Sequence, residues 1–399
     1  MSDCSFWIEG SDNALLDSSC TGSPTYRMYS MGYGSYGQLG LGNFDERTDQ
    51  PTAVPSLEAD VIDMSRGTYH TVVLMKDGTV KLTGSNWYGE LGTGDGPVGT
   101  DVNLFQSPNP LPGVVTAIGG GYCTSFVVID DKLYACGLGQ VGGLGTENEV
   151  DLHEFTHIES APSGIVSVKG GWFQVMLLTD SGELWGAGKN NYGCLGLGHQ
   201  NITYGFELLA TNVVDYFIQA DHSVIVKEDG NAYMAGRMKW AGLDDVATST
   251  VFVFAFGDCA EAGVGMRHTV YRKNDGTLYA GGDNSYGQLG INTWEHHYDD
   301  IVPCQTFDQG PLGSMEALSV GDYHTLAYHG IENLEDWQWT YYGAGQNFAY
   351  GQLGQDTGSS NVEWFYGGGR TEVEADEFIF TRIIAGEHTS FILRQNGWL

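Results

Sequence analysis

Histidines recur along the chain in a fixed local context that resembles part of a catalytic set. A glycine, two variable residues, the histidine and a threonine follow one another in Gly67-Thr68-Tyr69-His70-Thr71, Gly265-Met266-Arg267-His268-Thr269 and Gly321-Asp322-Tyr323-His324-Thr325. An imidazole beside a hydroxyl is a pairing that general-base catalysis uses. A structural unit is repeated as often as the fold requires, however, whereas an active site is normally built once. We therefore expect these histidines to hydrogen-bond loop backbone within each repeat, and we expect no enzyme.

Two further segments carry residue types found in cofactor and metal sites. The segment 32–37 reads Gly-Tyr-Gly-Ser-Tyr-Gly and has the glycine spacing of a dinucleotide-binding turn, but Leu-Gly follows it where such a turn would open a helix. The segment 294–300 places His296 and His297 among acidic residues. Adjacent side chains of an extended segment point to opposite faces and rarely share one ion. We therefore expect no cofactor and no metal, and a solvated acidic loop at 294–300.

The residues around these motifs repeat along the whole chain. Each copy contains a Gly-x-Leu-Gly element or its equivalent, whose leucines are Leu39, Leu91, Leu144, Leu195, Leu243, Leu289 and Leu353. The histidine element runs in phase with it, and its central residues are His70, Cys123, Phe173, His222, His268, His324 and His388. The distance from this central residue to the next leucine is 21 or 22 residues in five copies and 29 in the sixth. A constant offset indicates a constant structural unit.

Each unit contains a β-hairpin pattern. Apolar and β-branched runs flank an Asp-Gly turn at Asp77-Gly78, and similar turns recur in other copies. Short strands at this spacing, almost without helical periodicity, predict an all-β, seven-bladed β-propeller. The last copy stops at 397–399 before its outgoing strand, and the missing strand is present at 27–32. We expect this N-terminal strand to complete the last blade and close the ring, which pairs both sheet edges.

The repeated residues resemble those of the regulator-of-chromosome-condensation family. Its units carry a Gly-x-x-His-Thr element, an Asp-Gly turn and a final Gly-x-Asn-x-x-Gly-Gln-Leu-Gly element, to which 281–290 is the closest copy. The resemblance covers about residues 26–399 and implies a single seven-bladed propeller preceded by an N-terminal extension, 1–25, which is either a docking peptide or disordered. The family includes nucleotide-exchange factors for small GTPases, ubiquitin-ligase modules, a plant ultraviolet-B photoreceptor and a secreted β-lactamase inhibitor. The fold therefore does not select a function.

Composition narrows the choice of partner. The chain has 17 Lys and Arg against 50 Asp and Glu, a net charge of −33, so its field repels phosphate backbones and anionic membranes. It has no basic N-terminal stretch typical of a signal peptide and no apolar run of the roughly 18 residues that a membrane span needs. We expect a soluble protein, either intracellular or virion-associated, that binds neither nucleic acid nor membrane. The seven cysteines include no C-x-x-C pair, and we expect reduced thiols, with a Cys123–Cys136 disulfide as the alternative.

The residue before each central motif residue is the best candidate for binding, because we expect one of these residues per blade on a single rim. They are Tyr69, Tyr122, Trp172, Asp221, Arg267, Tyr323 and Glu387. Aromatic side chains of this kind are enriched at interface hot spots. The alternative is that they only cap the central channel. A second candidate is the acidic insertion 329–339, which carries Trp337 and Trp339.

These patterns favour a non-enzymatic protein–protein interaction scaffold, a component of a larger assembly such as a virion or a phage tail. The alternative is a guanine-nucleotide exchange factor for a small GTPase, which the family resemblance allows. Exchange factors of the family that act on chromatin also carry a basic tail, and 1–25 has no Lys or Arg. Photoreception fits poorly, because the photoreceptor's repeated Gly-Trp-Arg-His-Thr is matched only by Gly171-Trp172-Phe173, where the arginine is missing.

Overall fold

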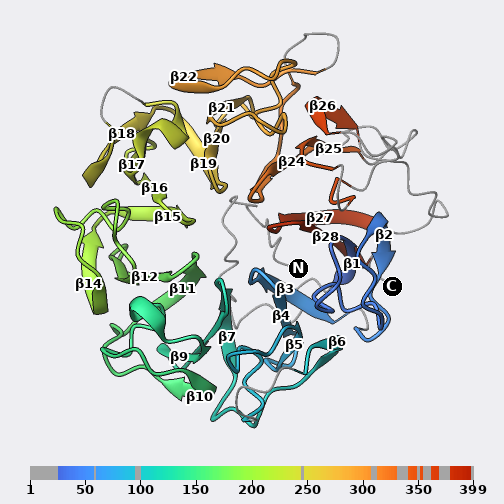
Figure 1. The fold of residues 1–399 in the computed structure, drawn as a ribbon, viewed down its shortest axis with the longest axis vertical. Coiled ribbons are helices and arrows are strands. Elements are labelled where there is room, and N and C mark those ends of the chain that lie inside the picture. The colour runs from blue at the N-terminus through green and yellow to red at the C-terminus, as the bar shows by residue number, and fades with distance from the viewer. Residues whose placement is uncertain are drawn as a thin grey trace, which may run out of the picture.

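The described part of the chain is a ring of seven four-stranded antiparallel blades around a central channel (Figure 1). The computed structural model describes residues 26–57, 60–94, 100–243, 247–306, 312–329, 340–347, 351–353, 361–367 and 378–396. These residues form 28 strands, four to a blade, and two short 3-10 helices, η1 (Gln140–Gly142) and η2 (Met238–Ala241). None of the described residues belongs to a helix with the length and hydropathy that a bilayer span requires.

Each blade has one strand beside the channel and three more that succeed it toward the outside of the ring. In this outward order, blade 1 contains β3 (Val61–Arg66), β4 (His70–Met75), β5 (Val80–Gly84) and β6 (Val102–Gln106). Blade 2 contains β7 (Val115–Gly120), β8 (Thr124–Ile129), β9 (Lys132–Gly137) and β10 (Leu152–His157). Blade 3 contains β11 (Ile165–Gly170), β12 (Gln174–Thr179), β13 (Leu184–Gly188) and β14 (Thr203–Ala210). Blade 4 contains β15 (Val213–Ile218), β16 (His222–Lys227), β17 (Ala232–Gly236) and β18 (Ser249–Phe256).

The remaining blades continue the same order around the ring. Blade 5 contains β19 (Cys259–Val264), β20 (His268–Lys273), β21 (Leu278–Gly282) and β22 (His297–Pro303). Blade 6 contains β23 (Ala317–Val320), β24 (His324–His329), β25 (Thr340–Gly345) and β26 (Val362–Gly367). Blade 7 contains β27 (Phe378–Ala385), β28 (Thr389–Asn396), β1 (Tyr26–Gly32) and β2 (Thr48–Ala53), so it combines strands from both ends of the chain.

Closure of the ring by the N-terminal strand is confirmed. Strand β1 pairs with β28 over seven positions, from Tyr26↔Gln395 to Gly32↔Thr389. Tyr29 and Phe391 therefore lie on neighbouring strands of one sheet, with Ser30 opposite Phe391. A single bridge, Tyr26↔Val61, links blade 7 to blade 1, and the other five blades are separate sheets. Residues 1–25 lie outside the described residues.

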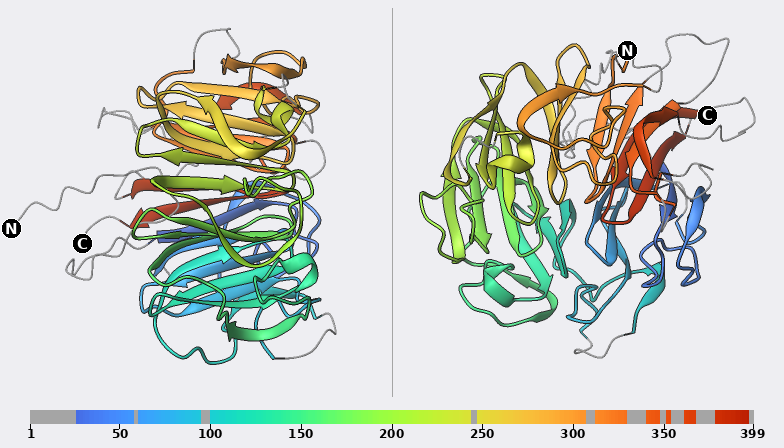
Figure 2. Two further views of the ribbon diagram at one scale, coloured as in Figure 1. Left: turned by 90° about the vertical axis from the view of Figure 1, so that its left-hand side faces the viewer. Right: turned by 45° about the horizontal axis from the view of Figure 1, so that its top comes forward.

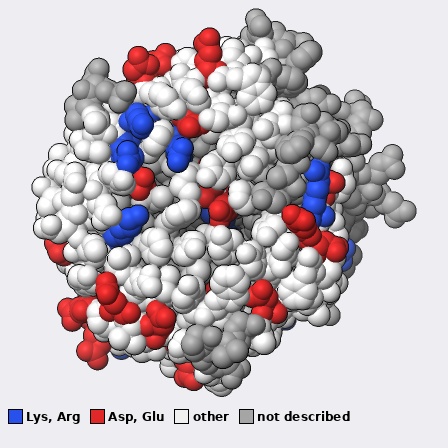
Figure 3. All heavy atoms as spheres, viewed as in Figure 1, with Lys and Arg blue, Asp and Glu red and all other residues white. Residues whose placement is uncertain are grey.

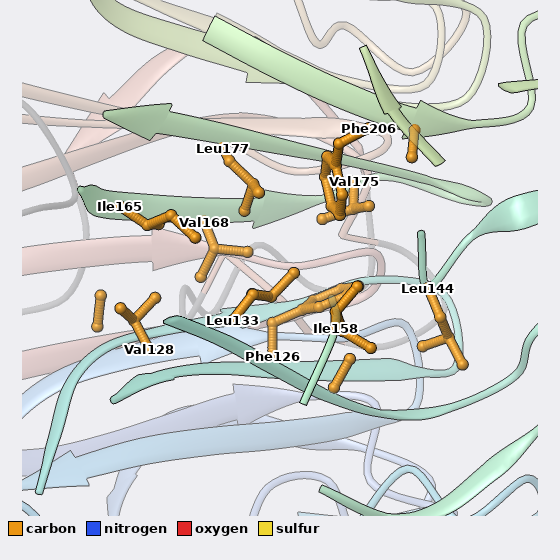
Figure 4. Packing of buried hydrophobic residues seen from close by; sticks show 13 residues of the cluster. Phe126, Val128, Leu133, Leu144, Ile158, Ile165, Val168, Val175, Leu177 and Phe206 are labelled. Carbon is orange, nitrogen blue, oxygen red and sulfur yellow. The ribbon is translucent and has the colours of Figure 1, made fainter. Parts of the chain in front are cut away.

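The hydrophobic core lies between the blades, as Figure 4 shows for blades 2 and 3. There Phe126 and Val128 of β8 pack with Val168 of β11 and with Val175 and Leu177 of β12. The second strand of each blade is buried on both faces because a neighbouring blade covers each side, and this explains its continuous apolar sequence. Burying an aliphatic or aromatic side chain of this size stabilises the fold by about 1.5–3 kcal/mol.

The Leu-Gly elements explain why the repeat is so regular. In four of them the leucines, Leu39, Leu91, Leu144 and Leu195, are buried, and the glycine that follows each one adopts a left-handed conformation against an aromatic ring of the next blade. A Cβ on Gly40, at φ +68°, would lie 2.4 Å from the ring of Phe105, and one on Gly145 would lie 2.4 Å from Phe206. Only glycine permits this approach, so the element fastens each blade to the next.

The cysteines and the tight turns agree with the expectations. Five cysteines, Cys123, Cys136, Cys194, Cys259 and Cys304, are buried free thiols, so the structure contains no Cys123–Cys136 disulfide. Asp130 and Asp131 form a hairpin turn in which both residues have positive φ, 49° and 60°. Such values match the two-residue turns that suit the twist of a hairpin.

Candidate functional site: the motif face

The loops that join the first and second strands of each blade lie on one side of the ring, with the loops that join the third and fourth strands. Backbone bonds tie the two kinds of loop together within a blade, for example from Tyr33 N to His388 O at 2.9 Å and from Ser85 N to Tyr69 O at 2.8 Å. We call this side the motif face; it is the one shown in Figure 3. Figure 2 shows it edge-on, on the right of the left-hand view.

Strand pairing fixes the register of the histidine motif and corrects it in three blades. The residues that begin the second strands pair with the glycines that end the third strands, and they are His70, Thr124, Gln174, His222, His268, His324 and Thr389. Cys123, Phe173 and His388, expected at this position, each lie one residue earlier. Blades 2 and 3 contain Gly-Gly pairs, Gly120-Gly121 and Gly170-Gly171, so two alignments matched the sequence equally well.

The expected rim residues consequently occupy two structural positions rather than one. Tyr69, Asp221, Arg267 and Tyr323 stand directly before the second strand, as expected. Tyr122, Trp172 and Glu387 stand one residue earlier, at the position that Thr68, Ala220, Met266 and Asp322 occupy in the other blades. All seven still belong to the loops of the motif face.

The motif histidines connect blades, which corrects the expectation that they bond loop backbone within each blade. His70 Nε2 lies 2.9 Å from Ser125 Oγ of the next blade, and His324 Nε2 lies 2.8 Å from Ser390 Oγ. His222 and His268 contact the next blades' Thr269 and Thr325 in the same way, at 3.0 and 3.2 Å.

These imidazoles are held neutral by the fold. Ser125 Oγ donates to Glu90 O at 2.6 Å, so it accepts from His70, which carries its proton on Nε2. Burial lowers the pKa of His70 to about 4 and that of His268 to about 3. Each imidazole is 0–1% exposed, so no substrate reaches it. The motif histidines are therefore structural.

Aromatic side chains form an unbroken chain of ring contacts across the motif face, which we call the aromatic arc. It runs from blade 5 through blades 6, 7, 1 and 2 to blade 3, with successive ring centroids 4.7 to 6.4 Å apart. Its members are Tyr286, Tyr323, His388, Tyr33, Tyr36, Tyr69, Tyr122 and Trp172. The exposed indole of Trp87 packs edge-on against Tyr36 at 5.5 Å.

Sequence reasoning found four of the arc's members and missed the others. Tyr69, Tyr122, Trp172 and Tyr323 were expected on this rim. Tyr36 and Tyr286 were not, although each stands directly before Gly-Gln-Leu-Gly, so an aromatic residue at the start of that element marked the position in the sequence.

Basic side chains occupy the opposite part of the motif face, over blades 3 to 5. Arg237 lies 3.7 Å above the ring of Tyr192 and forms an ion pair with Asp221 at 3.2 Å. Lys239 and Arg267 lie 4.3 and 5.6 Å from the ring of Trp240. Figure 3 shows Lys and Arg side chains gathered in one sector of this face. In a chain with so few basic residues, this local concentration gives the face two chemically distinct parts.

Acidic side chains lie at the mouth of the channel. Asp322 of blade 6 is 1% exposed, and Gln219 of blade 4 donates a hydrogen bond to its Oδ1. Glu387 of blade 7 lies beside it, and burial next to Asp322 raises the pKa of Glu387 to about 8. Figure 3 shows acidic atoms at the centre of the face. The central channel below is lined by the innermost strand of every blade.

Comparison with known proteins identifies the repeat. The family model described as "Regulator of chromosome condensation (RCC1) repeat" matches residues 27–74 and 275–328. The regulator of chromosome condensation of Xenopus laevis is 24% identical over 75% of this chain and 76% of its own length. The ultraviolet-B receptor UVR8 of Arabidopsis thaliana is 26% identical over 75% of this chain and 69% of its own length.

Solved structures of the same fold agree with this match. Yeast RCC1 (Prp20), in a structure bound to Kap60, superimposes with a TM-score of 0.79 at 19% identity, covering 100% of this chain and 95% of that one. Human WBSCR16 also gives a TM-score of 0.79 at 19% identity, over 94% of this chain and 100% of that one.

The chain carries RCC1 repeats.

Relatives of this RCC1-repeat protein differ in their activities. A secretion-regulating guanine nucleotide exchange factor of Bos taurus is 29% identical over 52% of this chain, and the match spans 48% of that protein. A match to half of a protein does not transfer the activity of the whole, and the solved structures, at 19% identity, show the fold.

Three other segments of this RCC1-repeat propeller carried residue types found in binding or metal sites: 32–37, 294–300 and 329–339. Residues 32–37 form a turn between β1 and β2, with no helix after it, so the dinucleotide-site hypothesis fails. His296 Nδ1 accepts from Asn284 N at 2.9 Å, whereas His297 Nδ1 lies 2.7 Å from Asp300, so the two imidazoles have separate partners. Trp337 and Trp339 lie outside the described residues.

Proposed function

We propose that this RCC1-repeat protein is a non-enzymatic binding module that docks a protein partner on its motif face. The observation that carries the proposal is the aromatic arc, which brings eight rings from six blades together on one side of the molecule. Rigid aromatic side chains supply large contact areas at low entropic cost and dominate interface energetics. The basic sector beside the arc adds a charged region that orients a partner.

The related structures are consistent with this use of the fold. One relative, yeast Prp20, was solved bound to Kap60, and a second structure of it, with a TM-score of 0.78 at 17% identity, is described together with its binding to Gsp1p and histones. We extend only the general property, protein binding, to this chain.

Affinity capture with matched variants tests the proposal. The wild-type chain, Trp87→Ala, Tyr122→Ala and the control Phe254→Ala are immobilised and exposed to extract from the source organism. Trp87 and Phe254 are both exposed aromatics, at 44% and 59%, but Phe254 lies on the outermost strand of blade 4. Loss of a hot-spot side chain costs about 2 kcal/mol or more of binding free energy. We expect a partner that the control captures as well as the wild type, and that Trp87→Ala and Tyr122→Ala each bind roughly thirtyfold more weakly. Equal recovery by all four proteins would reject the motif face as the docking surface.

Guanine-nucleotide exchange is the second candidate, supported by the similarity to the bovine exchange factor. Release of labelled GDP from a panel of small GTPases distinguishes a binding module from an exchange factor. A binding module leaves the release rates unchanged at micromolar concentration, whereas an exchange factor accelerates one of them strongly.

We also propose, from the composition of the chain, that the protein is a component of a larger assembly such as a virion. The chain combines few basic residues with 22 tyrosines and 10 tryptophans, which suits extended contact with other proteins. Sedimentation of the native protein from its source tests it: migration with a large particle supports the assembly, and migration as a free 43.2 kDa protein rejects it.

A further inference from the structure

The aromatic arc does not close around the motif face, and its gap lies over blade 4. One end of the arc is Tyr286 of blade 5, and the other end is Trp172 of blade 3. Figure 3 shows Lys and Arg side chains gathered in one sector of this face. The basic sector occupies the gap with four side chains from blades 3, 4 and 5: Lys189, Arg237, Lys239 and Arg267.

The fold does not require basic residues at these positions. The residue that follows the glycine ending the third strand is Lys189 in blade 3 and Arg237 in blade 4. In the other blades that residue is uncharged or acidic: Tyr33, Ser85, Leu138, Asp283 and Gln346. Arg267 stands before the second strand of blade 5, where the other blades have Tyr69, Cys123, Phe173, Asp221, Tyr323 and His388. Positive charge is therefore confined to three blades and breaks the sevenfold repeat of the face.

The positive charge of the basic sector is accessible and only partly neutralised. Arg267 is exposed, and the other three side chains are partly exposed. Among the four, only Arg237 forms an ion pair with a described carboxylate, that of Asp221 at 3.2 Å. Asp283, a second acid of this region, accepts hydrogen bonds from Ser285 N and Gln288 Nε2. The charges of the remaining three cations are therefore left to solvent or to a partner.

Aromatic rings hold the cations of the basic sector in place. Arg237 lies 3.7 Å above the ring of Tyr192, and Lys239 and Arg267 lie 4.3 and 5.6 Å from the ring of Trp240. A ring face attracts a cation without using its N–H groups as a carboxylate would. A long side chain restrained in this way also loses less rotamer freedom when it binds. The basic sector therefore presents positioned donors to an anionic group.

We propose that the partner docked on the motif face carries an acidic segment, rich in Asp and Glu, that lies on the basic sector. This rests on the proposed function and names the chemistry of one side of the partner. A face built from seven similar blades would otherwise offer similar contacts in several rotations about the ring axis. A partner surface that is apolar with carboxylates along one side fits in a single rotation, because only that rotation places the carboxylates on blades 3 to 5.

Carboxylates fit the basic sector better than a phosphate backbone does. The cations come from three blades and lie over separate or shared rings, so single spaced charges match them. Asp221 lies among them and repels a continuous polyanion. The net charge of −33 also repels a long nucleic acid, whereas a short acidic segment responds mainly to charges within the Debye length of about 8 Å.

A pair of short peptides tests the proposal without the partner. The acidic probe is acetyl-Gly-Glu-Gly-Glu-Gly-Glu-Gly-amide, and the neutral probe has Gln in place of each Glu. Binding is measured by NMR titration of the full chain and of Lys239→Gln/Arg267→Gln. The control is Lys76→Gln/Lys132→Gln, which removes the same charge at two exposed lysines beside turns on the opposite side of the ring.

We expect the acidic peptide to bind the wild-type chain and the control at least about fivefold more tightly than the neutral peptide. The Lys239→Gln/Arg267→Gln variant should lose this preference. Lys239→Arg/Arg267→Lys keeps both charges and should retain it, which separates loss of charge from altered packing around Trp240. A preference that survives in the glutamine variant, or that is lost in the charge-conserving one, would overturn the proposal. A short single-stranded DNA that binds the sector more tightly than the acidic peptide would also overturn it.

Capture of the partner separates failure of this inference from failure of the proposed function. Capture that depends on Trp87 and Tyr122 but is unchanged in Lys239→Gln/Arg267→Gln leaves the motif face as the docking surface and rejects only the acidic segment. Asp244 and Asp245 follow η2 in sequence and lie outside the described residues. If the acidic peptide binds only after Asp244→Asn/Asp245→Asn, the chain supplies its own carboxylates to the sector and the proposal is wrong.

Discussion

Replacing His70 by glutamine should make the protein less sensitive to acid. Glutamine is the residue that blade 3 already has at this position, where Gln174 Nε2 donates to Ala220 O of the next blade at 2.9 Å. The substitution keeps a side-chain N–H donor toward Ser125 but removes a group that titrates. It therefore isolates the effect of the buried imidazole on the free energy of unfolding.

The expected magnitude follows from the pKa of His70 in the two states. Burial lowers this pKa to about 4, from about 6.5 in the unfolded chain. The buried Nδ1 has no acceptor among the described residues, so a proton added there finds no partner. The stabilising contribution is fully present above pH 6.5 and is lost as the pH falls toward 4, because only the unfolded chain takes up the proton. At pH 5 the loss is about 1.5 pH units at about 1.4 kcal/mol each, or about 2 kcal/mol.

Urea unfolding at pH 7.5 and pH 5.0 measures this contribution. The wild-type free energy of unfolding should fall between the two conditions by about 2 kcal/mol more than that of His70→Gln. Buried carboxyls such as Glu387 act in the opposite direction, but they are common to both proteins and cancel in the comparison. The control is His157→Gln, at an exposed position on β10, which should behave like the wild type. An equal pH dependence in His70→Gln and the wild type would refute the assignment of a neutral, buried imidazole.

Two further predictions test the architecture. A Cβ on Gly67 would lie 2.0 Å from Cε1 of His70 and 2.7 Å from Gly121 O, so Gly67→Ala should cost about 3 kcal/mol in denaturant unfolding, whereas Gly313→Ala, with nothing within 4 Å, should change stability by less than about 0.5 kcal/mol. Equal effects would show that the loop relaxes around the methyl group. Deleting residues 1–32 removes β1 and exposes the edge of β28, so we expect aggregation or loss of a cooperative unfolding transition, while deleting residues 1–25 should leave a monomer with unchanged thermal unfolding. A cooperative monomer without β1 would contradict ring closure by this strand.

The number of blades and the closure of the ring could be predicted because the same residues recur in every repeat at the positions that its strands and turns require. Leu39 and its six counterparts recur at the same place in every unit, and the glycines beside them are required by contacts such as that of Gly40 with Phe105. Such residues must recur wherever one blade meets the next, so their number gave the number of blades. The strand pattern at 27–32, ahead of the first complete unit, likewise predicted how the ring closes.

The exact register of the motif could not be predicted where the sequence was degenerate. Gly120-Gly121 and Gly170-Gly171 allow two alignments of the motif. In blade 7, His388 resembles the motif histidine in sequence, but Thr389 is the residue that begins the second strand and pairs with Gly32. Only the hydrogen bonding between strands separates these alternatives, because it depends on which residue pairs with the glycine that ends the third strand.

The sequence by itself determined the number of blades, the closing strand and the loops that carry the candidate binding residues. Tertiary structure alone decided that the motif histidines bond hydroxyls of the next blade, that the rings form one arc, and that Asp322 and Glu387 meet above the channel. The physical reason is that repeats encode contacts within a blade and with its neighbour, whereas a ring also brings together side chains from blades that do not touch, as Asp322 and Gln219 do across the axis.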